Sequence, residues 1–202
     1  MFNWDLTLQI GGLIVGLLYL WWEYNADRRL WIASVVMPAI SLWLYFRKGL
    51  YADFAINIYY LAIAVYGYLA WTKHRRRPDC DNNSHSTSAE PTSLPIRHTP
   101  MPVVVGCIGA TLILWLLIRW VLCSFTDSTV PTADAFTTAL SIVAMWMLAR
   151  KYIEQWLAWF VVDAVCVVLY IYKGIPLYAL LYALYTIIAL LGYRKWLKLM
   201  RK

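Results

Sequence analysis

The sequence predicts an all-α integral membrane protein with seven transmembrane helices, and three observations support this. The chain has 202 residues, of which 62% are hydrophobic, with 12 Trp and 15 Tyr. That is more apolar surface than a soluble domain of this size can bury. Seven apolar runs can be drawn, most of them long enough to cross a hydrocarbon core of about 30 Å. The basic residues behind the net charge of +7 cluster between these runs, which is typical of membrane topology rather than nucleic-acid binding.

The predicted helices are joined by short connections in all places but one. They cover residues 6–22, 30–46, 51–71, 102–122, 134–149, 154–172 and 176–197. Helices are expected rather than strands, because a run in lipid has to satisfy its own backbone hydrogen bonds. The exception follows the third helix: residues 73–100 hold a basic cluster and then Asp, Asn, Ser, Thr and Pro, which predicts a disordered cytosolic linker.

The positions of Lys and Arg predict the orientation. With the N-terminus outside, fourteen of these residues fall on the inner side. Only Arg47, Lys48 and Lys173 fall on the outer side, and Arg119 lies within the fourth helix. The positive-inside rule therefore favours an external N-terminus and a cytosolic C-terminus.

An internal repeat at an offset of 125 residues organises the chain. Gly67-Tyr68-Leu69-Ala70-Trp71 matches Gly192-Tyr193-Arg194-Lys195-Trp196, and Trp31 matches Trp156, without a gap between Trp21 and Trp71. The offset equals four membrane crossings, so the two halves are expected to point the same way. This predicts a 3+1+3 parallel repeat: a first three-helix repeat (1–72), the linker (73–100), a linking helix (101–123), and a second repeat with a basic C-terminal tail (130–202). The binding site of such a protein is expected between the halves, near mid-membrane.

The sixth predicted helix carries the strongest candidate site. Trp156, Trp159 and Asp163 stand at i, i+3 and i+7, so they share one helix face. Asp163 is roughly 13–14 Å along the axis from Glu154, at about 1.5 Å per residue. A carboxylate at that depth costs about 2.5–3.5 kcal/mol, so it is expected to face a cavity or a partner. Two indoles beside a buried anion form the chemistry of a cation cage.

Other interpretations of these side chains remain open. Tryptophans in membrane helices commonly pack or lie at the interface, and Asp163 could instead hydrogen-bond a neighbouring helix. The repeat breaks at this site, since Asp163 aligns with Pro38 and Trp159 aligns with Ser34. The full set of predicted substrate-binding residues is Trp156, Trp159, Asp163, Asn57, Tyr60, Trp31, Tyr182 and Tyr185.

The sequence lacks the motifs of several common classes of enzyme and of retinal proteins. It has no GxxxxGK[ST] loop, no HExxH and no GxSxG, and no lysine in the middle of the seventh predicted helix for a retinal. The four cysteines, Cys80, Cys107, Cys123 and Cys166, lack zinc-ligand spacing. We therefore expect no enzyme activity, no catalytic residue, no cofactor, no metal site and no nucleic-acid partner.

The chain resembles the PnuC family of vitamin transporters. The resemblance rests on Gly49-Leu50-Tyr51-Ala52-Asp53, Tyr66-Gly67-Tyr68-Leu69-Ala70-Trp71, Glu154-Gln155-Trp156-Leu157-Ala158-Trp159 and Gly192-Tyr193-Arg194-Lys195-Trp196. It implies a SWEET-like fold, a homotrimer in the lipid of the bacterial inner membrane, and facilitated diffusion of a B vitamin. It also implies functional coupling to a cytosolic vitamin kinase, which traps the substrate by phosphorylation.

The family's W-x-x-W-x-x-x-N pattern maps onto Trp156, Trp159 and Asp163, with Asp in place of the Asn of the nicotinamide riboside carriers. Thiamine has a fixed positive charge and an aminopyrimidine that can donate to a carboxylate. The resemblance to the thiamine-type (PnuT-like) members and the acid at position 163 therefore favour thiamine as the substrate. The alternatives are a nicotinamide riboside transporter of the same family and a non-transporting membrane sensor or scaffold.

Overall fold

The computed structural model describes residues 18–35, 38, 51–73, 94–126, 130–174 and 176–201. The chain forms two compact units, residues 1–95 and 96–202, and each is described by itself. Within the described ranges the named elements are all helices, and the one β-type feature is an isolated bridge between Arg97 and Tyr152. The predicted all-α class is therefore confirmed.

The first unit shows parts of its three predicted helices. Residues 18–24 and 30–35 are helical, and α3 spans Tyr51–Lys73, two residues beyond the predicted end. The remaining parts of the first two predicted helices, residues 6–17 and most of 36–46, lie outside the described residues. So do residues 74–93 of the predicted linker.

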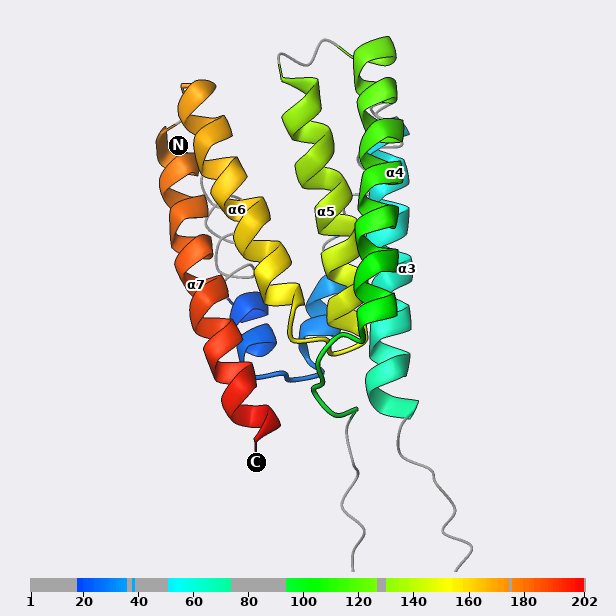
Figure 1. Ribbon diagram of the computed structural model, residues 1–202, viewed down its shortest axis with the longest axis vertical. Coiled ribbons are helices and arrows are strands. Elements are labelled where there is room, and N and C mark those ends of the chain that lie inside the picture. Colours follow the sequence, from blue (N-terminus) through cyan, green and yellow to red (C-terminus); the bar gives the residue numbers. More distant parts are fainter. Residues whose placement is uncertain are drawn as a thin grey trace, which may run out of the picture. The chain divides into compact units, whose positions relative to one another are not determined.

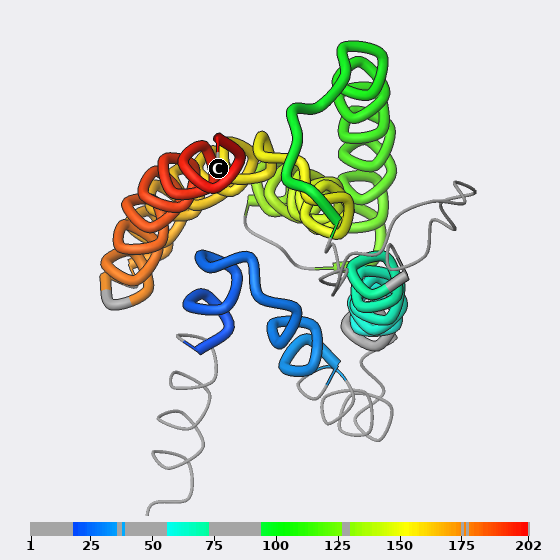
Figure 2. Tube along the Cα trace, turned by 90° about the horizontal axis from the view of Figure 1, so that it is seen from below, coloured from blue at the N-terminus to red at the C-terminus, as the bar shows by residue number. Residues whose placement is uncertain are grey.

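The second unit is a row of four helices. They are α4 (Met101–Phe125), α5 (Pro131–Ala149), α6 (Gln155–Tyr172) and α7 (Pro176–Met200). Successive helices run in opposite directions, and each packs on the next in chain order (Figures 1 and 2). Proline occupies the first turn of α4 and α5, where its missing N–H has no helical partner to lose. The predicted bounds agree with these helices to within a few residues.

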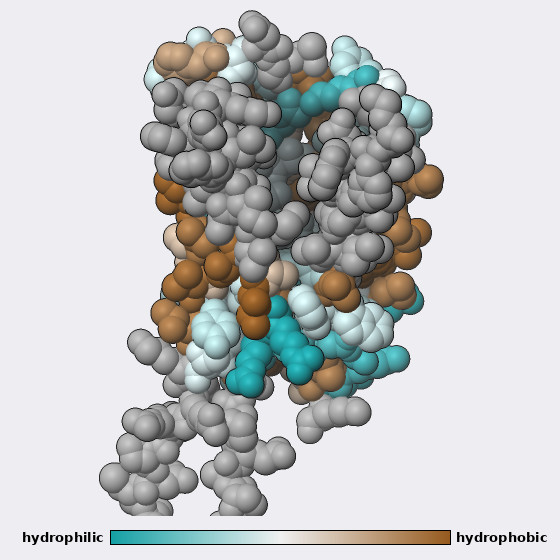
Figure 3. All heavy atoms as spheres, turned by 180° about the vertical axis from the view of Figure 1, so that it is seen from behind, coloured by the Kyte–Doolittle hydropathy of each residue, from teal (hydrophilic) through white to brown (hydrophobic). Residues whose placement is uncertain are grey.

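Three helices of the described residues, α4, α5 and α6, are long and apolar enough to cross a membrane. No residue of α4 is buried, although Ile113, Leu116 and Trp120 are large and apolar. Figure 3 shows such apolar side chains on the flanks of the described helices. A predominantly apolar helix that packs on one neighbour and leaves its other sides exposed is expected to face lipid or another chain there.

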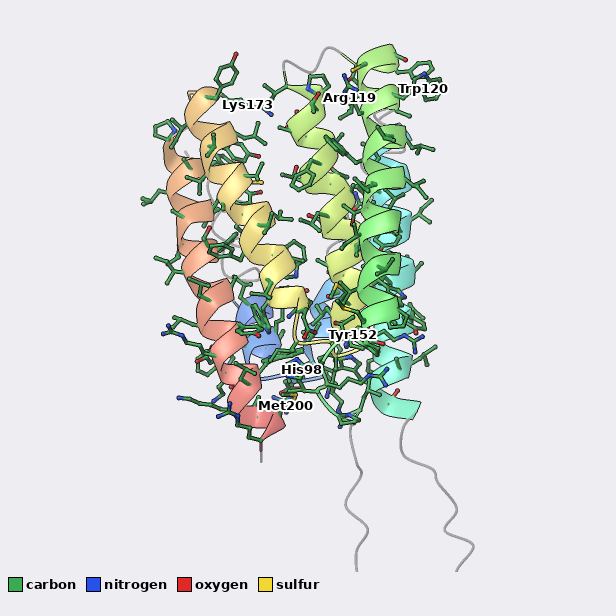
Figure 4. All side chains as sticks on the ribbon, in the orientation of Figure 1. His98, Arg119, Trp120, Tyr152, Lys173 and Met200 are labelled. Carbon is green, nitrogen blue, oxygen red and sulfur yellow. The ribbon has the colours of Figure 1, made fainter. Side chains whose placement is uncertain are left out.

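The segment that enters α4 is fastened to the loop between α5 and α6. Arg97 donates its backbone N–H to the carbonyl of Lys151 (3.2 Å) and accepts from the N–H of Ile153 (3.1 Å). Its guanidinium lies over the Tyr152 ring, 5.0 Å from the centroid. We call residues 97–99 together with residues 151–154 the clasp; Figure 4 places His98 and Tyr152 at the same end of the unit.

Glu154 completes the clasp. Its carboxylate accepts hydrogen bonds from the Thr99 hydroxyl (2.6 Å) and backbone N–H (2.8 Å), and one oxygen lies 2.8 Å from Nδ1 of His98. Burial is the largest single influence and raises the pKa of Glu154, but the hydrogen bonds from Thr99 and His98 together outweigh it and leave the pKa lowered. At the opposite end of the unit, Lys173, which follows the last residue of α6, pairs with Asp134 of α5 at 2.9 Å (Figure 4).

Candidate functional site

The first three turns of α6 hold two of the four polar side chains that are buried in the described part of the second unit, Gln155 and Asp163. Gln155 is 0% exposed, Trp156 is 2% exposed and Asp163 is 7% exposed, while Trp159 is partly buried. Leu157, Val161 and Val168 on the other side of the helix are exposed and apolar. The helix is therefore amphipathic in the way expected of a membrane helix: its apolar side chains are exposed, and its polar side chains face the interior of the unit.

Trp156 packs closely against α7. Its ring meets Trp196 edge to face, with centroids 5.8 Å apart and planes at 85°. A Cβ added at Gly192 would lie 2.6 Å from the same indole, so only glycine leaves room for it. Trp156, Gly192 and Trp196 form what we call the second tryptophan corner.

The first unit contains the same arrangement at the positions 125 residues earlier. Trp31 meets Trp71 edge to face, with centroids 5.6 Å apart and planes at 88°, and a Cβ at Gly67 would overlap the Trp31 ring. Trp31, Gly67 and Trp71 form the first tryptophan corner. The sequence repeat is therefore also a repeat of side-chain packing at these positions.

The turn that leads into each corner is also repeated. Before α6, Lys151 donates to the Leu148 carbonyl and Tyr152 donates to the Met147 carbonyl, the pair of bonds that defines a Schellman motif. In the first unit, Ala26 donates to Glu23 and Asp27 donates to Trp22, again at the offset of 125. Ala26 and Lys151 both have a φ of 53°, although neither is glycine.

Asp163 lies one turn beyond Trp159, close to two side chains of α7. It is within electrostatic range of Tyr182, Tyr185 and Cys166. Tyr182 stacks on Tyr170 with centroids 5.2 Å apart and contacts Tyr185 edge to face at 5.8 Å. Five of the predicted site residues thus belong to the α6 and α7 pair: Trp156, Trp159, Asp163, Tyr182 and Tyr185.

Several polar atoms in or beside the two corners are buried and have no hydrogen-bond partner within the described part of the chain. They are both amide atoms of Gln155 and the indole nitrogens of Trp156, Trp159 and Trp31. A buried polar group without a partner costs about 1–3 kcal/mol, and each such group calls for an explanation. The Trp156 and Trp31 nitrogens share this property at equivalent positions, whereas those of Gln155 and Trp159 are peculiar to the second unit.

The comparisons with known proteins agree on one family. The family model described as "Nicotinamide mononucleotide transporter" matches residues 6–198. The chain belongs to this family, the PnuC family.

Two relatives match over most of their length, and a third matches over about a third of its length. The nicotinamide riboside transporter PnuC of Escherichia coli is 29% identical over 79% of this chain and 72% of its own. The transporter of that name from Neisseria mucosa is 22% identical over 100% of this chain and 76% of its own. The riboflavin/roseoflavin transporter RibM of Streptomyces davaonensis is 38% identical over only 33% of this chain and 31% of its own.

A solved structure has the same fold. The crystal structure of the vitamin B3 transporter PnuC superposes with a TM-score of 0.65 at 21% identity, and covers 93% of this chain and 79% of the other. The α6 pattern Trp156, Trp159 and Asp163 therefore lies in a PnuC-type helical fold.

The first-unit candidates lie among other polar side chains of that unit. Asn57 and Tyr60 are partly buried on α3, and the Tyr60 ring is 5.7 Å from that of Tyr59. Trp31 is fully buried in its corner. Tyr19 is joined by side-chain hydrogen bonds to Glu23 and to Ser34, the repeat partner of Trp159.

Sequence reasoning missed two buried polar residues of this PnuC chain. Gln155 and Glu23 are 0% and 2% exposed, yet neither was among the predicted site residues. The repeat contained the signal, because Gln155 aligns with Leu30 and Glu23 aligns with Leu148. At both positions one half has a polar side chain where the other half has leucine.

Proposed function

We propose that this PnuC family member is an uptake transporter for a flat cationic vitamin, and that nicotinamide riboside is its substrate. The observation that carries the proposal is the carboxylate of Asp163, which is buried in a membrane-spanning helix beside Trp159 and the tyrosines of α7. A pyridinium ring can stack on an indole while a nearby carboxylate offsets its charge. In this proposal Trp159 stacks on the ring, Asp163 interacts with the cation, and Tyr182 and Tyr185 line the same side.

The choice of substrate differs from the thiamine favoured by the sequence. Asp163 by itself is compatible with thiamine or with nicotinamide riboside, so the choice between them rests on the relatives. Two relatives that match over most of their length are named as nicotinamide riboside transporters, which supports the alternative interpretation over thiamine. A mononucleotide is disfavoured, because its phosphate would bring negative charge toward a buried carboxylate. Riboflavin has no positive charge for Asp163 to offset.

The remaining features of the transporter are proposals of the same kind. The recurrence of the tryptophan corner and its turn at an offset of 125 supports a 3+1+3 parallel repeat like that of SWEET carriers. The charge distribution supports an external N-terminus and a cytosolic C-terminus in the bacterial inner membrane. We further propose a homotrimer that works by facilitated diffusion, with a cytosolic kinase trapping the vitamin. Asn57, Tyr60 and Trp31 of the first unit and Trp156 of the second stay predictions from the sequence as substrate-binding residues.

The test combines binding and transport on the purified full-length protein. Thermal shift and calorimetry in detergent compare nicotinamide riboside, its mononucleotide, thiamine and riboflavin, because a bound ligand raises the melting temperature by mass action. Uptake of labelled nicotinamide riboside into proteoliposomes then measures transport. We expect binding and uptake of nicotinamide riboside, and equilibration without accumulation in the absence of an ion gradient.

Three outcomes would contradict parts of this proposal. Tighter binding of thiamine would return the substrate to the sequence-based prediction. Accumulation driven by a proton gradient would overturn facilitated diffusion. A folded protein that takes up none of the four compounds would favour the sensor or scaffold instead.

A further inference from the structure

Gln155 has a buried side chain whose presence the fold does not explain. Its amide is 0% exposed, and neither Oε1 nor Nε2 has a hydrogen-bond partner in the part of the chain that the structure describes. The amide carries two N–H donors and a carbonyl acceptor, all withdrawn from water. A buried group of this kind needs a ligand or an ordered water to satisfy it.

The first unit provides an internal control for this position. Leu30 aligns with Gln155, is also 0% exposed, and precedes a tryptophan packed in the same corner. The two residues make the same backbone bond, from Leu30 N–H to Asp27 and from Gln155 N–H to Tyr152 (both 3.3 Å). The fold of the corner is therefore compatible with a plain apolar side chain, and the amide is an addition of the second unit.

The location of Gln155 connects it to the proposed site. Gln155, Trp159 and Asp163 stand at i, i+4 and i+8 on α6, so they form a continuous stripe that turns slowly around the helix. The stripe is about 12 Å long at the rise of an α-helix, with the indole in the middle. A flat heterocycle stacked on Trp159 would have one edge toward Gln155 and its substituents toward Asp163.

We propose that Gln155 recognises a carboxamide on the transported ligand. A primary carboxamide has one carbonyl and one NH₂ group, so it pairs with a glutamine amide through two antiparallel N–H to O=C hydrogen bonds. The order along the stripe is then the carboxamide at Gln155, the ring on Trp159, and the ribose hydroxyls donating to Asp163. The inference rests on the proposed function, and it adds a specificity residue outside the W-x-x-W-x-x-x-N pattern.

The test changes the ligand and the protein together. Calorimetry on the full-length protein compares nicotinamide riboside with pyridine riboside, which has the same positive charge and lacks the carboxamide. Because the charge is unchanged, any contribution of Asp163 cancels in the ratio of the two affinities. The protein change is Gln155→Leu, which installs the side chain of the first corner and is expected to leave the melting temperature unchanged or raised.

In the unmodified protein we expect nicotinamide riboside to bind about tenfold more tightly than pyridine riboside. In Gln155→Leu the ratio is expected to fall to about one, through loss of nicotinamide riboside affinity alone. A purely structural role for Gln155 would weaken both ligands equally. Gln155→Met serves as a second variant of similar length, should the leucine variant fold poorly.

Two results would overturn the inference in distinguishable ways. If the unmodified protein discriminates between the ligands and Gln155→Leu and Gln155→Met do so equally well, the carboxamide is recognised elsewhere and only the role of Gln155 is wrong. If the unmodified protein binds no nicotinamide riboside, the proposed function fails and the assignment of Gln155 fails with it.

Discussion

The two tryptophan corners have the same architecture but carry different side chains. In both, an indole lies against a glycine and meets a second indole edge to face, and in both the preceding turn closes with the same pair of backbone hydrogen bonds. Around this shared frame, the first unit has Leu30 and Ser34 where the second has Gln155 and Trp159. Residues common to the corners are best explained by packing, and residues that differ are best explained by function.

The largest expected effect comes from breaking the shared frame. Gly192→Ala and Gly67→Ala each place a methyl group against an indole ring, so each is expected to destabilise the protein by about 3 kcal/mol, at the upper end for overpacking. Thermal unfolding in detergent measures the loss. Gly106→Ala on α4, where an added Cβ would have no neighbour within 4 Å, is the control. A variant that tolerates the methyl group in only one unit would show that the corners are not equivalent.

The next prediction separates the two tryptophans of α6. Trp159→Ser installs the residue of the first unit and removes the stacking surface, so nicotinamide riboside binding is expected to weaken by about thirtyfold, or about 2 kcal/mol. The melting temperature should change little. Trp156→Ala removes a buried packing residue and should instead lower the melting temperature. Equal losses of stability in both variants would contradict this division of roles.

Asp163→Asn tests the charge in the site. The substitution keeps a hydrogen-bonding group and removes the negative charge, so binding of nicotinamide riboside and of other cations is expected to weaken about fivefold. The melting temperature of Asp163→Asn should change little, which provides the control for folding. Unchanged affinity for the cation would indicate that Asp163 serves a contact between helices.

The clasp is a second difference between the two units, because the described part of the first unit contains no equivalent of it. Glu154→Gln replaces the carboxylate held by Thr99 and His98 and should lower stability by about 1 kcal/mol at neutral pH. Because the pKa of Glu154 is lowered on folding, its contribution is present in full above the ordinary value of 4.5 and is lost as the pH falls through the folded pKa.

Unfolding of Glu154→Gln and of the unmodified protein is therefore compared across the acidic range. The difference in melting temperature is expected to shrink as the solution becomes more acidic. A difference that is constant with pH would show that the carboxylate is not responsible.

The smallest expected effect concerns the turns. Ala26 and Lys151 occupy the left-handed region that favours glycine, so the change in backbone alone should stabilise Ala26→Gly and Lys151→Gly by about 0.5–1 kcal/mol each. Lys151 also destabilises the folded protein through its charge, because burial lowers its pKa to about 8. This destabilisation grows as the pH falls from 10.5 through 8 and the buried amine becomes charged. The gain from Lys151→Gly should thus be larger at pH 6 than at pH 10, while that from Ala26→Gly should not depend on pH.

The sequence by itself determined the class of the protein and the positions of its described helices. Long apolar runs have only one way to satisfy their backbone in lipid, which is why α3 to α7 begin and end within a few residues of the predicted limits. The offset of 125 also identified Trp31 and Trp156 as equivalent, because a repeat in sequence needs no coordinates to be recognised.

Only the tertiary structure decided what these residues do. Packing of Trp156 against Gly192 joins positions 36 residues apart in sequence, and helical periodicity on α6 alone cannot reveal it. Burial of Gln155 without a partner depends on which groups of other segments fail to reach it. The docking of Arg97 and Thr99 on the α5–α6 loop likewise joins segments more than 50 residues apart, and no local pattern encodes it.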